Sequence, residues 1–185
     1  PHFIIAGAMK SGTSSLHHVL NSHPDVYIPD GEIHFFDIDD LEQHPDFLLR
    51  DGQRWWVPDF EADFDDYFRW YQQHFSGAAA GQCIGEDSTT YLASALAPGR
   101  IAATLPNAKI IIMLRDPVHR AYSQYWHWVR SGRALGTFEQ MLRETPLVLL
   151  QRSFYKEQVD RVLAAFDRPQ VHFVIFEQFV REMQE

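Results

Sequence analysis

The sequence contains little cysteine and no long hydrophobic run, and each absence excludes a class of protein. Its single cysteine, Cys83, rules out an internal disulfide and suits a reducing compartment such as the cytoplasm. We expect Cys83 to be a buried, unreactive thiol. No apolar stretch reaches the ~20 residues that a membrane helix needs, and the first residues do not resemble a signal peptide. We therefore expect a soluble protein with no membrane partner.

Lysine is also scarce, with only Lys10, Lys109 and Lys156, and the formal net charge is -9. Nucleic acids are held mainly by clustered lysine and arginine, and the chain has no such cluster, so we expect no nucleic-acid partner. One of the three lysines lies in a glycine-containing loop, which favours a particular role for Lys10. Composition leaves the oligomeric state open.

What the sequence does contain is a regular alternation of strand and helix patterns. The 185 residues are 45% hydrophobic and predict one domain spanning residues 1–185. Strands are expected within 3–7, 26–28, 83–86, 109–114 and 171–176, and helices within 13–20, 67–75, 98–105, 118–130, 138–143, 153–166 and 177–185. This order predicts an α/β fold in which a mostly parallel central sheet carries helices on both faces. On the 118–130 helix, we expect Tyr122, Tyr125, Trp126 and Val129 to form the inner face.

The stretch 3–20, FIIAGAMKSGTSSLHHVL, predicts a strand, a short loop and a helix. Gly7 and Gly12 would let the backbone approach a ligand, Thr13 or a neighbouring Ser would cap the helix, and the exposed amides would attract a phosphate. Lys10 precedes Gly12 and does not follow it, so the loop is P-loop-like without the order typical of a Mg-triphosphate cradle. An ordinary strand-to-helix turn with a solvated lysine remains the alternative.

A second anion site is predicted where the buried strand 109–114 ends. Arg115 and Asp116 lie between that strand and a helix that Pro117 begins, with Asp116 as its expected cap, and Ser123 follows two turns later. A surface pair of Arg115 with Asp116 is the alternative, and such a pair would contribute little to stability.

A carboxylate and an imidazole stand two residues apart in Glu32-Ile33-His34-Phe35-Phe36. In an extended segment Glu32 and His34 would point to the same side. The alternative is a loop whose two phenylalanines enter the core while Glu32 and His34 stay in water. The acidic stretch 37–66 has no recognisable ligand spacing, so we assign no metal site.

The chain resembles the sulfotransferases that use 3'-phosphoadenosine 5'-phosphosulfate (PAPS), and is most similar to the branch of the heparan sulfate glucosaminyl sulfotransferases and their bacterial relatives. The similarity covers residues 3–176. It is carried by KSGTSSL at 10–16, HPDV at 23–26, GEIHFFD at 31–37 and RDPVHRAYSQY at 115–125.

This resemblance implies a role for each candidate residue. The 5'-phosphosulfate would be held by Lys10, Ser11, Gly12, Thr13, Ser14 and Ser15. Arg115 and Ser123 would hold the 3'-phosphate. Glu32 takes the position of the general base, and His34 that of a histidine lining the catalytic site. Lys10 would also stabilise the leaving phosphate, and no metal is required.

The resemblance further implies sulfation of a hydroxyl on a small molecule, an acyl chain or a carbohydrate, in a cytoplasmic and bacterial setting. Two departures bear on this expectation. Glu86 is followed by Asp87, where the glycan-modifying branch often has a lysine. The chain also stops before the late glycine-rich segment that covers the nucleotide in the family. A nucleotide-dependent kinase and a non-catalytic nucleotide-binding module remain the alternatives.

Overall fold

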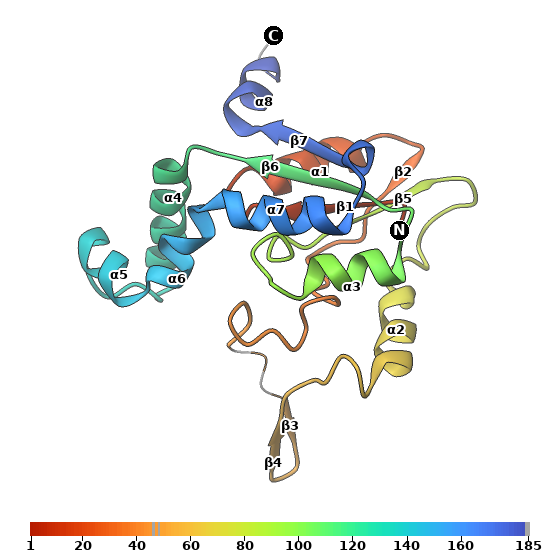
Figure 1. The fold of residues 1–185 in the computed structure, drawn as a ribbon, viewed down its shortest axis with the longest axis horizontal. Helices are drawn as coiled ribbons and strands as arrows, with labels where there is room; N and C mark the ends of the chain where they lie inside the picture. The colour runs from red at the N-terminus through yellow and green to blue at the C-terminus, as the bar shows by residue number, and fades with distance from the viewer. Residues whose placement is uncertain (46, 48, 184–185) are drawn as a thin grey trace.

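A computed structural model describes residues 1–45, 47 and 49–183 and contains a five-stranded parallel sheet (Figure 1). The strands are β1 (Phe3–Gly7), β2 (Val26–Tyr27), β5 (Cys83–Asp87), β6 (Lys109–Leu114) and β7 (Val171–Ile175), in the order β2-β5-β1-β6-β7. Every pairing within this sheet is parallel. The predicted α/β fold is therefore confirmed.

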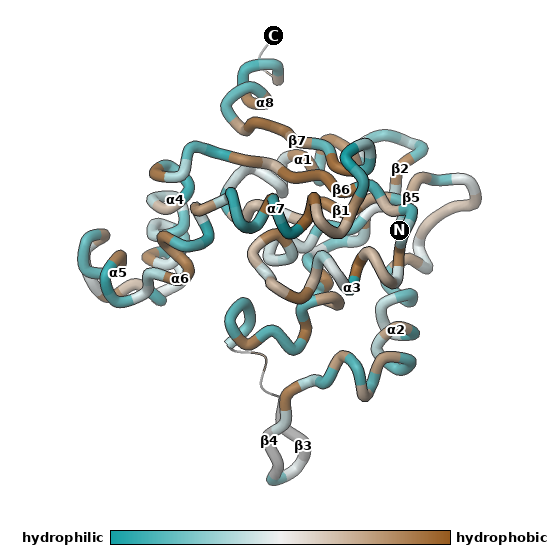
Figure 2. Tube along the Cα trace, in the orientation of Figure 1, coloured by the Kyte–Doolittle hydropathy of each residue, from teal (hydrophilic) through white to brown (hydrophobic). Residues whose placement is uncertain are grey.

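Helices cover both faces of the sheet, so the alternating side chains of β1 are buried in two different cores. Ile4 and Ala6 join the larger core with α3 (Ala97–Thr104) and α7 (Tyr155–Ala165). Phe3 and Ile5 face the opposite side, toward α1 (Thr13–Asn21) and α8 (Phe176–Glu182). Figure 2 shows hydrophobic residues running along the strands in the centre of the molecule. Burial on both faces explains why these strands are continuous apolar runs.

The remaining elements lie around the sheet. They are α2 (Phe64–Gln73), α4 (Pro117–Arg130), α5 (Phe138–Glu144), α6 (Pro146–Leu149), the 3-10 helices η1 (Gln151–Ser153) and η2 (Arg168–Gln170), and the hairpin of β3 (Leu49–Asp51) and β4 (Arg54–Trp56). The sequence did not predict the hairpin or α6, whose segments are too short to show a periodic pattern. The predicted cap of α4 is confirmed, since Asp116 Oδ1 accepts a hydrogen bond from His119 N at 2.9 Å. Among the described helices, none combines the length and apolar character needed to cross a bilayer.

Two predictions about burial were wrong. Cys83 is exposed because it is the first residue of β5, where the strand enters the sheet from solvent. On α4 the buried residues are Arg120, Ala121 and Gln124, whereas the predicted inner face has Tyr122, Trp126 and Val129 exposed by 46%, 43% and 36%. Helix α4 continues beyond the edge of the sheet, as Figure 1 shows, so its aromatic residues pack against Phe138 of α5 instead.

Candidate active site

The loop between β1 and α1 leaves the start of the helix uncapped by any side chain. Gly12 is the N-cap residue at φ +88°, so the predicted cap by Thr13 or a serine is wrong. A Cβ on Gly12 would lie 2.6 Å from the Phe176 ring, and glycine is therefore required for both conformation and space. The first amides of an α-helix have no partner within the helix, so those of Thr13 and Ser14 are available to an anion, whereas Ser15 N donates to the Gly12 carbonyl oxygen at 3.0 Å.

A cavity of about 440 Å³ opens above this loop, and we call it the donor cavity. It is lined by Met9, Lys10, Gly12, Thr13, Ser14, Glu32, Thr89, Arg115, Ser123, His127 and Phe176. The structure thus brings the glycine loop, the end of β6, helix α4 and Glu32 to one place. Ser11 is fully buried and Ser15 is exposed, and neither lines the cavity.

The Arg115 guanidinium contacts the backbone of Lys10, and both residues line the donor cavity. Arg115 Nη1 donates to the Lys10 carbonyl oxygen at 3.1 Å, and its guanidinium lies 4.5 Å from the centroid of the Phe176 ring. Arg115 Nε is buried without a partner. Burial and the nearby Arg130 and Arg115 lower the pKa of Lys10, although Glu32 opposes this shift. Two cations that line one cavity, one of them with an unused buried donor, form a site suited to an anion.

Glu32 lies on the wall of the same cavity, in a segment without regular secondary structure. Thr89 holds its carboxylate, because both the amide nitrogen and Oγ1 of Thr89 donate to it, at 3.1 and 2.9 Å. About a third (34%) of the Glu32 side chain remains exposed. Burial raises the pKa of Glu32, as does the nearby Asp87, while the bonds from Thr89 lower it. A carboxylate with a raised pKa is a stronger base than a solvated one.

His34 joins Glu32 to a buried carboxylate. His34 has φ +56°, so the segment is not extended, yet His34 Nε2 lies 3.2 Å from Glu32 Oε2. His34 Nδ1 lies 3.0 Å from Thr90 Oγ1, which donates to Asp37 Oδ2 at 2.5 Å. Burial lowers the pKa of His34 to about 4, so its imidazole is neutral at pH 7. The next two residues, Phe35 and Phe36, are fully buried as predicted for a loop anchored in the core.

His34, Asp37 and His44 also hold potential metal-ligating atoms, all within 4.8 Å of one another. The Thr90 hydroxyl oxygen occupies the space among them, at 3.0 Å from His34 Nδ1, 2.5 Å from Asp37 Oδ2 and 3.3 Å from His44 Nε2. Hydrogen bonds through Thr90 therefore account for this grouping.

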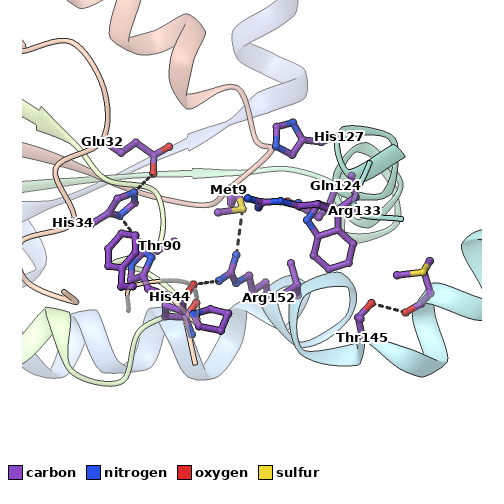
Figure 3. Close-up of a pocket in the computed structure, with 16 residues that line it drawn as sticks. Met9, Glu32, His34, His44, Thr90, Gln124, His127, Arg133, Thr145 and Arg152 are labelled. Atoms are coloured by element: carbon purple, nitrogen blue, oxygen red, sulfur yellow. Dashed lines mark hydrogen bonds and ion pairs between the residues drawn. The ribbon is translucent and has the colours of Figure 1, made fainter. Parts of the chain in front are cut away.

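A second cavity adjoins the first, and we call it the lateral cavity. Its volume is also about 440 Å³, and it shares Met9, Glu32 and His127 with the donor cavity (Figure 3). His34, His44 and Thr90 line it on one side, and residues of α4 line it on another, as Figure 3 shows. Glu32 stands between the two cavities, where it can contact a ligand in either.

Sequence reasoning missed several residues of the site. Thr89 and Thr90 lie in the polar turn after β5, at the sheet edge where open α/β sheets place ligands, so a signal for them existed. His127 lies four residues after Ser123 on α4, and residues at that spacing share one helix face. Arg152, from η1, carried no recognisable signal.

The comparisons with known proteins agree with this geometry. The sequence profile of the sulfotransferase family matches residues 1–185. A sulfotransferase from Alicyclobacillus acidocaldarius has a similar structure, with a TM-score of 0.80 and 37% identity over 98% of this chain and 75% of that one. The sulfotransferase domain from the curacin biosynthetic pathway, at a TM-score of 0.63 and 16% identity, shares the fold over 98% of this chain and 69% of that domain.

Human relatives cover the chain but are longer. Heparan sulfate glucosamine 3-O-sulfotransferase 3B1 is 28% identical over 98% of this chain and 43% of its own length. The human bifunctional heparan sulfate N-deacetylase/N-sulfotransferase 2 is 31% identical over 94% of this chain and 20% of its own length. The chain therefore spans less than half the length of these relatives. Because the family profile matches the whole sequence, the chain belongs to the sulfotransferase family.

Proposed function

We propose that this protein transfers a sulfuryl group from PAPS to a hydroxyl group of a small-molecule or carbohydrate acceptor. The observation that carries the proposal is the donor cavity, in which Lys10 and the α1 amides, Arg115 with Ser123, and Glu32 face one space. A nucleotide with phosphates at two positions needs two cationic sites. The transfer also needs a base near the sulfuryl group on the 5'-phosphate, to take the proton of the acceptor hydroxyl.

The site residues fit such a donor. Lys10, Gly12, Thr13 and Ser14 line the cavity where the 5'-phosphosulfate would bind, with Ser11 and Ser15 as their neighbours in the loop. Arg115 and Ser123 would bind the 3'-phosphate, which would give the buried Arg115 Nε an acceptor. None of these contacts requires a metal ion, and we propose that none takes part.

The chemistry follows from the position of Glu32 between the two cavities. The donor supplies the sulfuryl group. A bond forms from the acceptor oxygen to sulfur while the bond from sulfur to the phosphate oxygen breaks. Glu32 takes the acceptor proton, a contribution of roughly 10²- to 10⁴-fold in rate. Thr89 orients the Glu32 carboxylate through its two hydrogen bonds, with the neutral His34 imidazole beside it, and Lys10 with the loop amides stabilises the charge that grows on the departing phosphate.

Calorimetric titration tests the proposal directly. We expect adenosine 3',5'-bisphosphate to bind without a metal and more tightly than ATP with Mg²⁺. Tighter, Mg²⁺-dependent ATP binding would favour the kinase alternative. Asp87 at the end of β5 would be an acidic ligand for that metal, but it pairs with His17 at 3.4 Å and does not line the donor cavity. A turnover assay with PAPS separates an enzyme from a non-catalytic module.

A further inference from the structure

Arg152 is buried in the wall of the lateral cavity with poor hydrogen-bond partners. It is 7% exposed, and its guanidinium points toward Met9 in Figure 3. Nη1 donates to Met9 Sδ at 3.2 Å and Nη2 to the Gln43 carbonyl oxygen at 3.3 Å, while Nε has no partner. A thioether is a weak acceptor and a guanidinium has five donors, so most of its bonding capacity is unused.

Arg120, which is buried, and Arg100, which is half-buried, make more or stronger hydrogen bonds, although Arg120 Nη1 is also buried without a partner. Arg120 donates to Ser153 Oγ at 2.6 Å and to the carbonyl oxygens of Val148 and Leu149 at 2.9 and 2.8 Å. Arg100 makes two bonds to the Asp39 carboxylate. The contrast indicates that the folded chain leaves more of the hydrogen-bonding capacity of Arg152 unused.

The charge of Arg152 also has no direct counterion in the part of the chain that the structure describes. Among the described residues, no carboxylate lies within salt-bridge distance of its guanidinium. Asp40 Oδ2 accepts a hydrogen bond from Ser94 Oγ at 2.6 Å, and Asp37 Oδ2 is engaged with Thr90 and His44, although Asp37 Oδ1 is buried without a partner. A buried, unpaired charge is costly, and a ligand that brings the opposite charge removes that cost.

We infer that the acceptor carries an acidic group that binds Arg152 while its hydroxyl lies at Glu32, on another part of the same cavity wall. This inference rests on the proposed function and specifies its acceptor. A volume of about 440 Å³ suits a small molecule, and Met9, Trp128 and Met141 provide apolar walls for its body. The class is a hydroxylated carboxylic acid with an apolar or aromatic skeleton.

The alternative role for Arg152 is structural, as a general counter-charge for Asp37, Asp40 and Glu32. Burial lowers the pKa of Arg152, and the charges of these three carboxylates oppose that shift. In that case removing the guanidinium would lower the melting temperature but would not change which ligands bind. The two roles therefore differ in ligand selectivity.

Benzoate and benzamide are a suitable pair of probes, because they have nearly the same shape and differ in charge. We would titrate each into the protein saturated with adenosine 3',5'-bisphosphate, which fills the donor cavity. Wild type should bind benzoate at least 10-fold more tightly than benzamide. Arg152→Gln should abolish the preference, whereas the matched control Arg161→Gln, which removes a charge outside the lateral cavity, should keep it. Equal affinities in wild type, or a preference that survives in Arg152→Gln, would overturn the inference.

A second measurement covers the case in which Arg152→Gln does not fold. A crystal structure of the wild type with benzoate should place the carboxylate on Arg152, and a carboxylate bound only elsewhere would contradict the subsite. The same samples report binding of adenosine 3',5'-bisphosphate. Failure of that binding would contradict the donor proposal, while loss of the benzoate preference alone would contradict only the acceptor class.

Discussion

Two glutamates near the carboxyl end of β5 have opposite surroundings. Glu86 is fully buried, and its carboxylate accepts hydrogen bonds from Tyr71 Oη at 2.5 Å, Tyr91 Oη at 2.6 Å and Ser88 Oγ at 2.8 Å. Glu32 is held on one side by Thr89 and His34 and keeps about a third of its side chain (34%) exposed. Burial raises the pKa of both carboxyl groups.

The difference separates a structural carboxylate, Glu86, from the proposed base, Glu32. The three hydroxyl groups around Glu86 join α2 to the turn after β5 and leave no route for a substrate. Glu32 has the same kind of pKa shift but borders two cavities. A raised pKa therefore identifies a candidate base only together with access to a ligand.

Replacing Glu32 should give the largest effect on function. We expect Glu32→Gln to keep binding of adenosine 3',5'-bisphosphate and to slow transfer by about 10²-fold or more, which is at least ~2.7 kcal/mol of barrier, because the proton acceptor is lost. Single-turnover rates with PAPS measure this. Glu61→Gln, far from both cavities, is the control. Near-normal turnover of Glu32→Gln would remove Glu32 from the role of base.

The pH dependence of the transfer rate is a second test of Glu32 as the base. A base must be ionised, and burial raises the pKa of Glu32, so the wild-type rate should already fall at a pH above the ordinary carboxyl value of 4.5. The residual rate of Glu32→Gln should lack this acid limb. An unchanged acid limb in the variant would assign the titration to another group.

Replacing Glu86 should mainly affect stability. Glu86→Gln places an amide among three hydroxyl donors and should cost about 1 to 3 kcal/mol in the free energy of unfolding. Because the folded-state pKa of Glu86 is raised, the folded protein binds more protons than the unfolded chain between 4.5 and that raised value. Wild-type stability from this group therefore falls as pH rises through that window, and the penalty of the variant should be largest in acid. Denaturant titrations at several pH values measure it, and a penalty that grows with pH would contradict the assigned shift.

Replacing Arg115 should distinguish the two phosphates of the donor. Arg115→Ala should weaken binding of adenosine 3',5'-bisphosphate by about 10- to 150-fold, because a charge-assisted hydrogen bond contributes about 1.5 to 3 kcal/mol. AMP, which lacks the 3'-phosphate, should be affected much less and serves as the control ligand. Equal losses for both nucleotides would refute the assignment of the 3'-phosphate to Arg115.

Replacing Thr90 should have the smallest effect, because Thr90 acts through His34. Thr90→Val removes the hydroxyl between His34 and Asp37 and should lower kcat by about 3- to 10-fold, the value of one neutral hydrogen bond. The KM for PAPS should not change, and Thr90→Ser should restore the rate. A variant that loses only thermal stability would reduce Thr90 to a structural role.

Sequence reasoning predicted those elements whose formation depends on residues close together in the chain. Strand β6 is a continuous apolar run, and the Asp116-Pro117 pair starts α4 by capping chemistry within four residues. The predicted inner face of α4 was wrong because the burial of a helix face depends on which other elements pack against it. Its aromatic residues look like a core stripe, yet α4 leaves the sheet and they meet α5. On α2, Trp70 is 38% exposed, while its neighbour Tyr71 is buried and donates to Glu86.

By itself the sequence determined the parallel α/β fold and placed Lys10, Arg115 and Glu32 in segments that could meet, because strand ends of a parallel sheet share one edge. Only the tertiary structure decided what surrounds them. It packed Thr89 and Thr90 against Glu32 and His34 across more than 50 residues of chain, and it buried Arg152 beside Met9 across 143. Local patterns encode elements, whereas pKa shifts, cavities and unpaired charges arise from contacts between distant segments.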